Sequence, residues 1–335
     1  MTITDISPAP MVEIWRGPFL ESVHAGHAVV CDDTGQIVHA WGDSDAVILP
    51  RSSAKMIQGL PLLTSGAADA AGLSSEQLAL ACASHNGAAI HTDRASAWLK
   101  KLDLTEDSLR CGPQWPDDRS ANNALIRAHK KPCQVHNNCS GKHCGFLSLG
   151  KHLGAGPDYV NPDHPVQLAC LEAFEAVTEL ASPGYGIDGC SAPNFATTVH
   201  GMARAMAFFA SASGRTDTTS SAATRLVEAM MLHPDLVAGE GRACTELMRA
   251  MGGKVAIKTG AEAVYIAIVP EKKLGIALKI VDGATRASEC AIAALLVKLG
   301  VLSAMHPATK RRMNAPLKNR RGIDVGMIKP AASLL

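Results

Sequence analysis

Segments with β-strand character lie near both ends of this chain, and a long stretch with helical periodicity separates them. Residues 27–31 and 36–41 flank the turn sequence Asp32-Asp33-Thr34-Gly35, which predicts a hairpin. Residues 263–270 and 274–281 predict a second antiparallel pair. Helices can cover a sheet that distant segments share. We therefore expect an α+β fold, with an antiparallel sheet built from both chain ends and a largely helical middle.

The expected sheet comes from about residues 10–50 and 254–283, and the helical region covers about residues 52–250. No internal repeat or linker divides the sequence, so residues 1–335 are expected to form a single domain. The basic tail, residues 310–329, is expected to be a solvated segment. Apolar residues at helical spacing predict helices at 166–180, 198–212, 222–232, 243–251 and 286–299.

Composition excludes several classes of function. The 32 Lys and Arg residues nearly balance the 31 Asp and Glu residues, which argues against a general nucleic-acid binder. No apolar stretch approaches the roughly 20 residues that span a bilayer, and the first ten residues do not resemble a secretion signal. The ten cysteines are spread along the chain and do not form a dense disulfide framework. We expect a cytoplasmic protein with mostly reduced thiols.

Three short motifs occur in a meaningful order. Ser52 and Lys55 form S-x-x-K at the expected start of a helix, where a three-residue spacing places both side chains on one face. A neighbouring lysine can take the proton of a serine nucleophile. Ser84-His85-Asn86 matches S-x-N, and Lys258-Thr259-Gly260 matches K-T-G. This order is typical of serine acyl-transfer enzymes of the penicillin-binding and β-lactamase type.

A further polar cluster departs from that type of enzyme. Cys139 and His143 lie in one Gly-containing segment, and Cys190 follows much later. Thiolates and imidazole are zinc ligands, so these three side chains could form a metal site. The spacing matches no zinc-finger pattern, and a pair of buried cysteines in Gly-rich turns is the alternative.

Taken together, the motifs resemble the Rhizobium etli type of L-asparaginase, a class distinct from the Thr-dependent bacterial enzymes and from the plant enzymes with an N-terminal nucleophile. The similarity covers roughly residues 10–330. One departure is Ala263, where a glycine is expected. The segments that carry the resemblance are residues 51–55, 83–87, 138–143, 186–190, 258–262 and 319–322.

The resemblance implies a serine β-lactamase-like fold, a homodimer, and hydrolysis of L-asparagine to L-aspartate and ammonia. It also implies two Ser-Lys pairs, Ser52 with Lys55 and Ser84 with Lys258. The family carries zinc, one per subunit, at the positions that match Cys139, Lys142 and Cys190. The resemblance makes His143 a neighbour of the metal or a substrate contact.

Substrate binding requires groups that recognise an α-carboxylate and an α-ammonium. Arg51 is the candidate for the carboxylate and Asp188 the candidate for the ammonium. For both residues, a local salt bridge or turn contact is the alternative. Asn86 and His143 are further candidates for substrate contacts.

Two other functions share part of this pattern. A different serine amidohydrolase, such as a glutaminase or a β-lactam or ester hydrolase, would use the same three motifs. A metal-stabilised binding domain would use the cysteine cluster but would not need two buried lysines beside serines, because burying such charges is costly. The sequence leaves open which Ser-Lys pair acts first.

Overall fold

The computed structural model describes residues 7–335, and these residues divide into two compact units. Unit 1 contains residues 7–53, 197–211 and 246–335, and unit 2 contains residues 54–196 and 212–245. Residues 1–6, part of the segment in which we expect no secretion signal, lie outside the described residues. The single domain expected over residues 1–335 stays a prediction.

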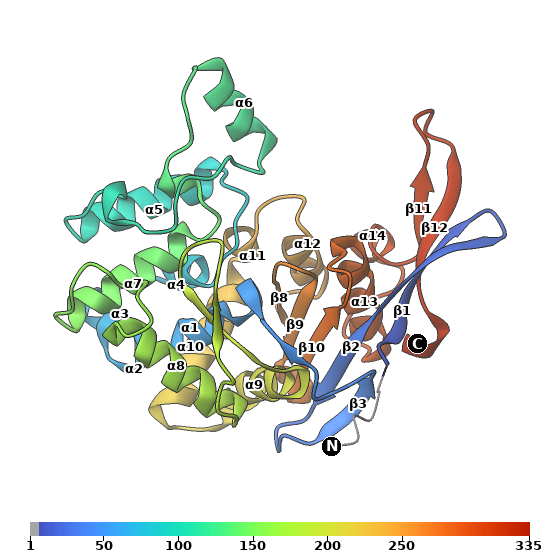
Figure 1. Ribbon diagram of the computed structural model, residues 1–335, viewed down its shortest axis with the longest axis horizontal. Helices are drawn as coiled ribbons and strands as arrows, with labels where there is room; N and C mark the ends of the chain where they lie inside the picture. Colours follow the sequence, from blue (N-terminus) through green and yellow to red (C-terminus); the bar gives the residue numbers. More distant parts are fainter. Residues whose placement is uncertain (1–6) are drawn as a thin grey trace. The chain divides into compact units, whose positions relative to one another are not determined.

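Unit 1 is built on an eight-stranded antiparallel sheet (Figure 1). Its strand order is β11-β12-β1-β2-β10-β9-β8, and β3 pairs with β2. Segments from both ends of the chain therefore pair with one another, which confirms the predicted organisation. The strands are β1 Ala9–Arg16, β2 Phe19–Cys31, β3 Ile37–Trp41, β8 Ala256–Thr259, β9 Val264–Val269, β10 Leu274–Ile280, β11 Ala315–Lys318 and β12 Asp324–Pro330.

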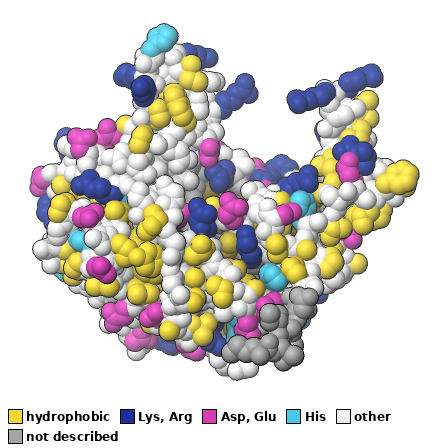
Figure 2. Space-filling model, in the orientation of Figure 1, with side chains coloured by type: hydrophobic (Ala, Val, Ile, Leu, Met, Phe, Trp, Pro, Cys, Tyr) yellow, Lys and Arg dark blue, Asp and Glu magenta, His cyan; other side chains and the backbone are white. Residues whose placement is uncertain are grey.

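The basic tail is not the solvated segment that we expected. Most of it folds into the β11–β12 hairpin, and β12 pairs with β1 from Val12 opposite Pro330 to Arg16 opposite Gly326. Figure 2 shows Lys and Arg side chains at the tip of this hairpin, where Arg320 is exposed. Its cations face water while the backbone completes the sheet, so charge alone did not reveal the strands.

Long helices pack against the centre of the sheet. Every residue of β9 is buried, so both faces of that strand are covered. Helix α9 Val199–Ser211 contacts β10, β2 and β9. At Gly275 a Cβ atom would lie 2.1 Å from the backbone nitrogen of Ala207, so a glycine is needed for this close approach. Helix α13 Thr285–Lys298 contacts β9 and β10 as well, and α14 Pro307–Lys310 follows it in the chain.

Unit 2 is mainly helical. Ser74 begins α4 with a capping box that it forms with Gln77. Helix α7 contacts α4 closely, because a Cβ atom at Gly141 would lie 2.3 Å from the carbonyl oxygen of Leu80. The helices are α1 Lys55–Gln58, α2 Leu60–Thr64, α3 Ala67–Ala70, α4 Ser75–Ala81, α5 Ala89–Lys101, α6 Arg119–Arg127, α7 Ser140–His152, α8 Pro165–Thr178, α10 Thr218–Leu232 and α11 Pro234–Val237.

The remaining elements are short or cross from one unit to the other. Strand β4 Val47–Ile48 pairs with β7 Thr197–Thr198 in unit 1, and β5 Tyr185–Ile187 pairs with β6 Pro193–Phe195 in unit 2. Helix α12 Ala243–Ala250 begins in unit 2 and ends in unit 1. All five predicted helices are present with ends shifted by a few residues. Within residues 7–335, no helix combines the length and apolar character needed to cross a bilayer.

Candidate active site

The S-x-x-K motif lies where the chain passes from unit 1 to unit 2. The 3₁₀ helix η1 Arg51–Ala54 contains Ser52 and continues directly into α1, whose first residue is Lys55. The Ser53 hydroxyl donates to the Pro50 carbonyl at 2.6 Å and holds the start of this segment. The predicted helix start is therefore confirmed, and Ser52 and Lys55 are one turn apart along it.

Within unit 2, Lys55 contacts the second serine motif. Its side chain is 1% exposed, and its Nζ donates to Ser84 Oγ at 3.1 Å and to the carbonyl oxygen of Ala83. The backbone nitrogen of Ser84 donates to Val237 O at 2.9 Å, which holds this segment against α11. The S-x-x-K spacing predicted Lys55 beside Ser52, and the resemblance implied Ser84 beside Lys258. Because Ser52 and Lys258 belong to unit 1, those pairings stay predictions, whereas the contact of Lys55 with Ser84 is a finding.

Asn86 holds a turn. It is buried, and its Oδ1 accepts the backbone N–H of Ala88 at 3.2 Å. Its own N–H donates to Ala238 O at 3.0 Å, and the side chain packs so closely against Gly239 that a Cβ there would lie 2.4 Å from Asn86 Cγ. These contacts position the segment that carries Ser84. The predicted substrate contact of Asn86 stays a prediction.

The K-T-G motif lies beside the serine segment within unit 1. Lys258 is fully buried in β8, and its Nζ donates to Thr259 O at 2.7 Å. A Cβ atom at Gly260 would lie 2.6 Å from Pro50 O and 3.2 Å from the Ser53 nitrogen. Only glycine permits this approach, which explains why the motif ends in that residue. The sheet edge thus lies directly against the segment that carries Ser52.

The cysteine cluster forms entirely within unit 2. Cys139 and Lys142 come from the start of α7, and Cys190 comes from the turn between β5 and β6. All three side chains are buried, and Lys142 Nζ lies 3.1 Å from Cys190 Sγ. Asp188 shapes the turn, since its Oδ1 accepts the Gly189 N–H at 2.7 Å. The structure therefore brings together the three predicted zinc ligands and places Asp188 near them.

Charge in this cluster is concentrated on one sulfur. A hydrogen bond with Cys139 and the cation of Lys142 lower the pKa of the Cys190 thiol well below its usual value. The same hydrogen bond, together with burial, raises the pKa of Cys139. Burial is the largest single influence on the pKa of Lys142 and lowers it, but the charges of Cys190, Cys139 and Asp188 together outweigh burial and raise that pKa. Cys190 is therefore a thiolate beside an ammonium group when no metal is bound.

A chain of hydrogen bonds orients His143 beside the cluster. The Arg110 N–H donates to the Tyr159 hydroxyl at 2.8 Å, and that hydroxyl lies 2.8 Å from His143 Nδ1. Burial raises the pKa of Tyr159 and lowers that of His143, so the hydroxyl keeps its proton and the ring is neutral. His143 Nδ1 is then the acceptor of the Tyr159 hydroxyl proton, and the proton of the neutral ring is on Nε2. No local pattern in the sequence indicated Tyr159.

The donor atoms fit zinc. Two sulfur atoms and one amine nitrogen converge here, and zinc binds such donors in a tetrahedral arrangement with a fourth position to spare. Within residues 7–335, no group of three or more His, Cys, Asp or Glu side chains is arranged to hold a metal. A three-ligand site at this place therefore requires the Lys142 amine in its neutral form.

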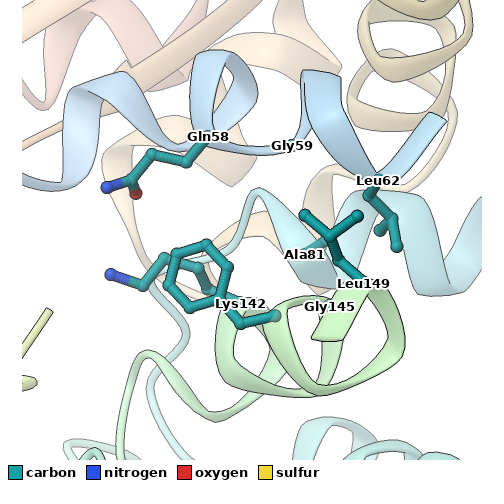
Figure 3. Close-up of a pocket in the computed structure, with 8 residues that line it drawn as sticks. Gln58, Gly59, Leu62, Ala81, Lys142, Gly145 and Leu149 are labelled. Atoms are coloured by element: carbon teal, nitrogen blue, oxygen red, sulfur yellow. The ribbon is translucent and has the colours of Figure 1, made fainter. Parts of the chain in front are cut away.

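A small cavity lies beside this cluster. Figure 3 shows Gln58 and Lys142 with their polar ends on the same side of it, and the Lys142 amine lies 5.2 Å from the centre of the Phe146 ring. The cavity volume is about 10 Å³, which is near the minimum that holds one water molecule. It cannot hold an amino acid.

Comparison with known proteins places this chain in a family. The profile described as L-asparaginase II matches residues 12–330. The chain belongs to the L-asparaginase II family. That membership supports a serine amidohydrolase. No match was found among curated proteins.

Solved structures similar to this chain share its α+β architecture. The crystal structure of Mglu in its native form matches with a TM-score of 0.50 and 14% identity, over 84% of this chain and 65% of Mglu. A putative beta-lactamase from Bacteroides dorei DSM 17855 matches with a TM-score of 0.44 and 12% identity, over 76% of this chain and 84% of that protein. The chain thus spans about two thirds of the length of Mglu. The match to Mglu confirms the predicted α+β fold.

Proposed function

We propose that the protein is an L-asparaginase that hydrolyses L-asparagine to L-aspartate and ammonia through a serine nucleophile. The observation that carries this proposal is the buried Lys55 amine 3.1 Å from the Ser84 hydroxyl, one helical turn after Ser52, in a chain of the L-asparaginase II family. A binding domain has no use for a lysine buried beside a serine, because its desolvation is costly.

In this mechanism Ser52 attacks the side-chain amide carbon of asparagine and Lys55 accepts the hydroxyl proton. The C–N bond then breaks, the departing nitrogen takes a proton, and ammonia leaves an acyl ester on Ser52. Ser84, which accepts a hydrogen bond from Lys55, and Lys258 form the second pair that passes the proton. Water adds to the ester, releases L-aspartate and restores the serine.

Substrate recognition in this proposal uses one cation and one anion. Arg51 binds the α-carboxylate, Asp188 binds the α-ammonium, and His143 and Asn86 contact the substrate. Cys139, Lys142 and Cys190 would hold a zinc ion, which would supply a Lewis acid close to the substrate. The homodimer and the cytoplasmic location belong to the same proposal.

The test of turnover is a coupled ammonia assay with asparagine and glutamine. We expect asparagine to be hydrolysed faster, and Ser52→Ala to lose at least about a thousandfold in kcat with the fold retained. Ser53→Ala is the matched control, because Ser53 Oγ donates to Pro50 O and has no part in the mechanism. Near-full ammonia release by Ser52→Ala would contradict the assignment and move the nucleophile to Ser84. Faster turnover of glutamine or of a β-lactam would favour the alternative hydrolases.

The test of the metal is elemental analysis of protein freed of adventitious ions. We expect about one zinc per chain, and a loss of that zinc in the double variant Cys139→Ala with Cys190→Ala. Cys144→Ala is the control, because Cys144 lies in the same helix and its thiol is directed at Ala95 O. Undiminished zinc in the double variant would contradict the site.

A further inference from the structure

His85 is the residue of the S-x-N motif to which the proposed mechanism gives no role. Ser84 before it accepts a hydrogen bond from Lys55, and Asn86 after it holds a turn. The His85 side chain is only 1% exposed. Burying an imidazole costs free energy unless its two nitrogen atoms form hydrogen bonds, so the partners of His85 indicate what the ring does.

Hydrogen bonds determine which nitrogen of the His85 ring carries the proton. Burial lowers the pKa of His85 well below its usual value, so the ring is neutral. The Gly87 N–H donates to Nδ1 at 3.2 Å, which makes Nδ1 the acceptor. The proton is therefore on Nε2, and Nε2 donates to the hydroxyl oxygen of Ser140 at 2.9 Å.

His85 holds the start of α7 on both sides of Cys139. Its side chain donates to Ser140, the residue after Cys139, and Ser140 is completely buried. Its backbone N–H donates at 3.2 Å to the carbonyl oxygen of Asn138, the residue before Cys139. These two hydrogen bonds fix the backbone that carries the Cys139 thiol.

A second histidine holds the face of the His85 ring. The His91 ring stacks on it, with 4.7 Å between the ring centroids and 8° between the planes. His91 Nε2 donates to the carbonyl oxygen of Asp235 at 2.9 Å. Asp235 belongs to α11, in which Val237 O also accepts the backbone N–H of Ser84. The His85 ring therefore contacts the start of α7 at its edge and a histidine anchored to α11 at its face.

We propose that His85 is a positioning residue that couples the thiol cluster to the contact between Lys55 and Ser84. Its imidazole joins the backbone of Cys139, a candidate zinc ligand, to the segment that presents Ser84 to Lys55. When a metal holds Cys139, the start of α7 is fixed, and His85 passes this restraint to Ser84. Because coupling is reciprocal, a change that frees Ser84 from α7 must also weaken metal binding. The inference rests on the proposed function, which supplies both the metal and the role of Ser84.

The experiment compares His85→Gln with His85→Asn in the full chain. The side-chain nitrogen of glutamine can replace Nε2 and keep the donor to Ser140, whereas asparagine can replace only Nδ1. We expect His85→Asn to weaken zinc binding by about tenfold, measured by competition with a chromophoric chelator, because it removes a hydrogen bond that orients the ligand backbone. We expect kcat for asparagine to fall by a similar factor with KM nearly unchanged, since the hydrogen bond from Lys55 to Ser84 acts in proton transfer. His85→Gln should keep both quantities within about threefold of the parent.

Helix α7 offers a matched control. Ser140→Ala removes the acceptor for His85 and should reproduce both losses, and combining it with His85→Asn should add little to them. Ser148 is also buried in α7 and accepts a hydrogen bond from Trp98 Nε1 at 3.0 Å. Ser148→Ala therefore removes the same kind of hydrogen bond away from the cluster, and it should leave zinc affinity and kcat unchanged.

Three results would overturn the inference: equal zinc affinity in His85→Asn and the parent, equal losses in the two His85 variants, or an equal loss in Ser148→Ala. Zinc binding that depends on His85 in a protein that does not hydrolyse asparagine would reject the proposed reaction alone. Asparagine hydrolysis with a zinc affinity independent of His85 would reject this inference alone. A parent chain that binds no zinc would reject the inference together with the proposed metal.

Discussion

The thiol cluster of unit 2 and the cavity of unit 1 that His27, Arg51, Glu262 and Lys279 line each contain a lysine removed from water, but the two lysines respond in opposite ways. Lys142 is buried against the Cys190 sulfur, and its pKa is raised. Lys279 is partly buried with a carbonyl oxygen as its hydrogen-bond partner, and its pKa is lowered by that burial. Burial disfavours the ammonium form in both places. At Lys142 the charges of Cys190, Cys139 and Asp188 together outweigh burial, whereas at Lys279 those of Glu262 and Asp282 do not.

This difference separates a cluster whose buried charges neutralise each other from a cavity that charged side chains line. The ammonium of Lys142 and the thiolate of Cys190 satisfy each other, so removing either group leaves an uncompensated buried charge. Lys279 instead lines a cavity of about 430 Å³ and is only partly buried, so its loss should cost less stability. Three predictions test this comparison, from the largest expected effect to the smallest.

Removing the Lys142 cation should cost the most stability. In protein treated with a chelator, we expect Lys142→Met to lower the free energy of unfolding by about 3 kcal/mol, because it leaves the Cys190 thiolate buried without a cation. Urea denaturation measures this loss. Lys318→Met is the control, since its ion pair with Asp324 is exposed at 2.7 Å and should contribute under about 1 kcal/mol. Equal small losses in both variants would show that the cluster is not held by this pair.

Relieving the strain at the cavity should have a smaller and opposite effect. Ala263 has a φ of 58° at a position where the resemblance led us to expect glycine. We expect Ala263→Gly to raise the free energy of unfolding by about 0.5–1 kcal/mol, because glycine adopts this conformation without steric cost. Thermal or urea unfolding measures the gain. Ala277→Gly, inside β10, should instead destabilise the protein, and a loss in both variants would contradict the account of strain.

The smallest expected effect is a difference between the two lysines in how the free energy of unfolding depends on pH. The folded-state pKa of Lys279 is below its ordinary value of 10.5, so the cost of burying its charged form is present below that folded pKa. That cost disappears as pH rises toward 10.5, and the stability of the wild type relative to Lys279→Met should therefore increase over this interval. For Lys142 the pKa is raised, so its stabilisation should stay constant below 10.5 and decline above it. Denaturation curves from pH 8 to 11 measure how the free energy of unfolding changes with pH for each lysine, and equal slopes for both would contradict this account.

Local patterns in the sequence predicted much of the fold. The turn at Gly35 and the segments of β-strand character on both sides of it predicted the β2–β3 hairpin, and the five helices followed from apolar spacing. The β11–β12 hairpin was missed because its exposed cations hide the strand pattern and its partner β1 lies some three hundred residues earlier. Pairing across that separation has no local signal.

The site also has a part that could be predicted and a part that could not. The motifs identified Ser52, Lys55, Ser84 and Lys258, and the resemblance added Cys139, Lys142 and Cys190. The packing of α7 against the β5–β6 turn placed Lys142 beside Cys190, and the segment after α4 placed Ser84 beside Lys55. Neither the hydrogen bond from Tyr159 to His143 nor the cross-strand pairing of Lys279 with His27 could be predicted from spacing.

The sequence by itself determined the order of the motifs, the sheet shared by the chain ends, and the turn at Gly35. Those features depend on periodicity, turn chemistry and backbone conformation, which act over a few residues. Only the tertiary structure decided that Lys55 contacts Ser84, that Cys190 carries the charge of the thiol cluster, and that three charged side chains border one cavity. These contacts join segments far apart in the chain, and burial then sets the protonation of the groups that meet there.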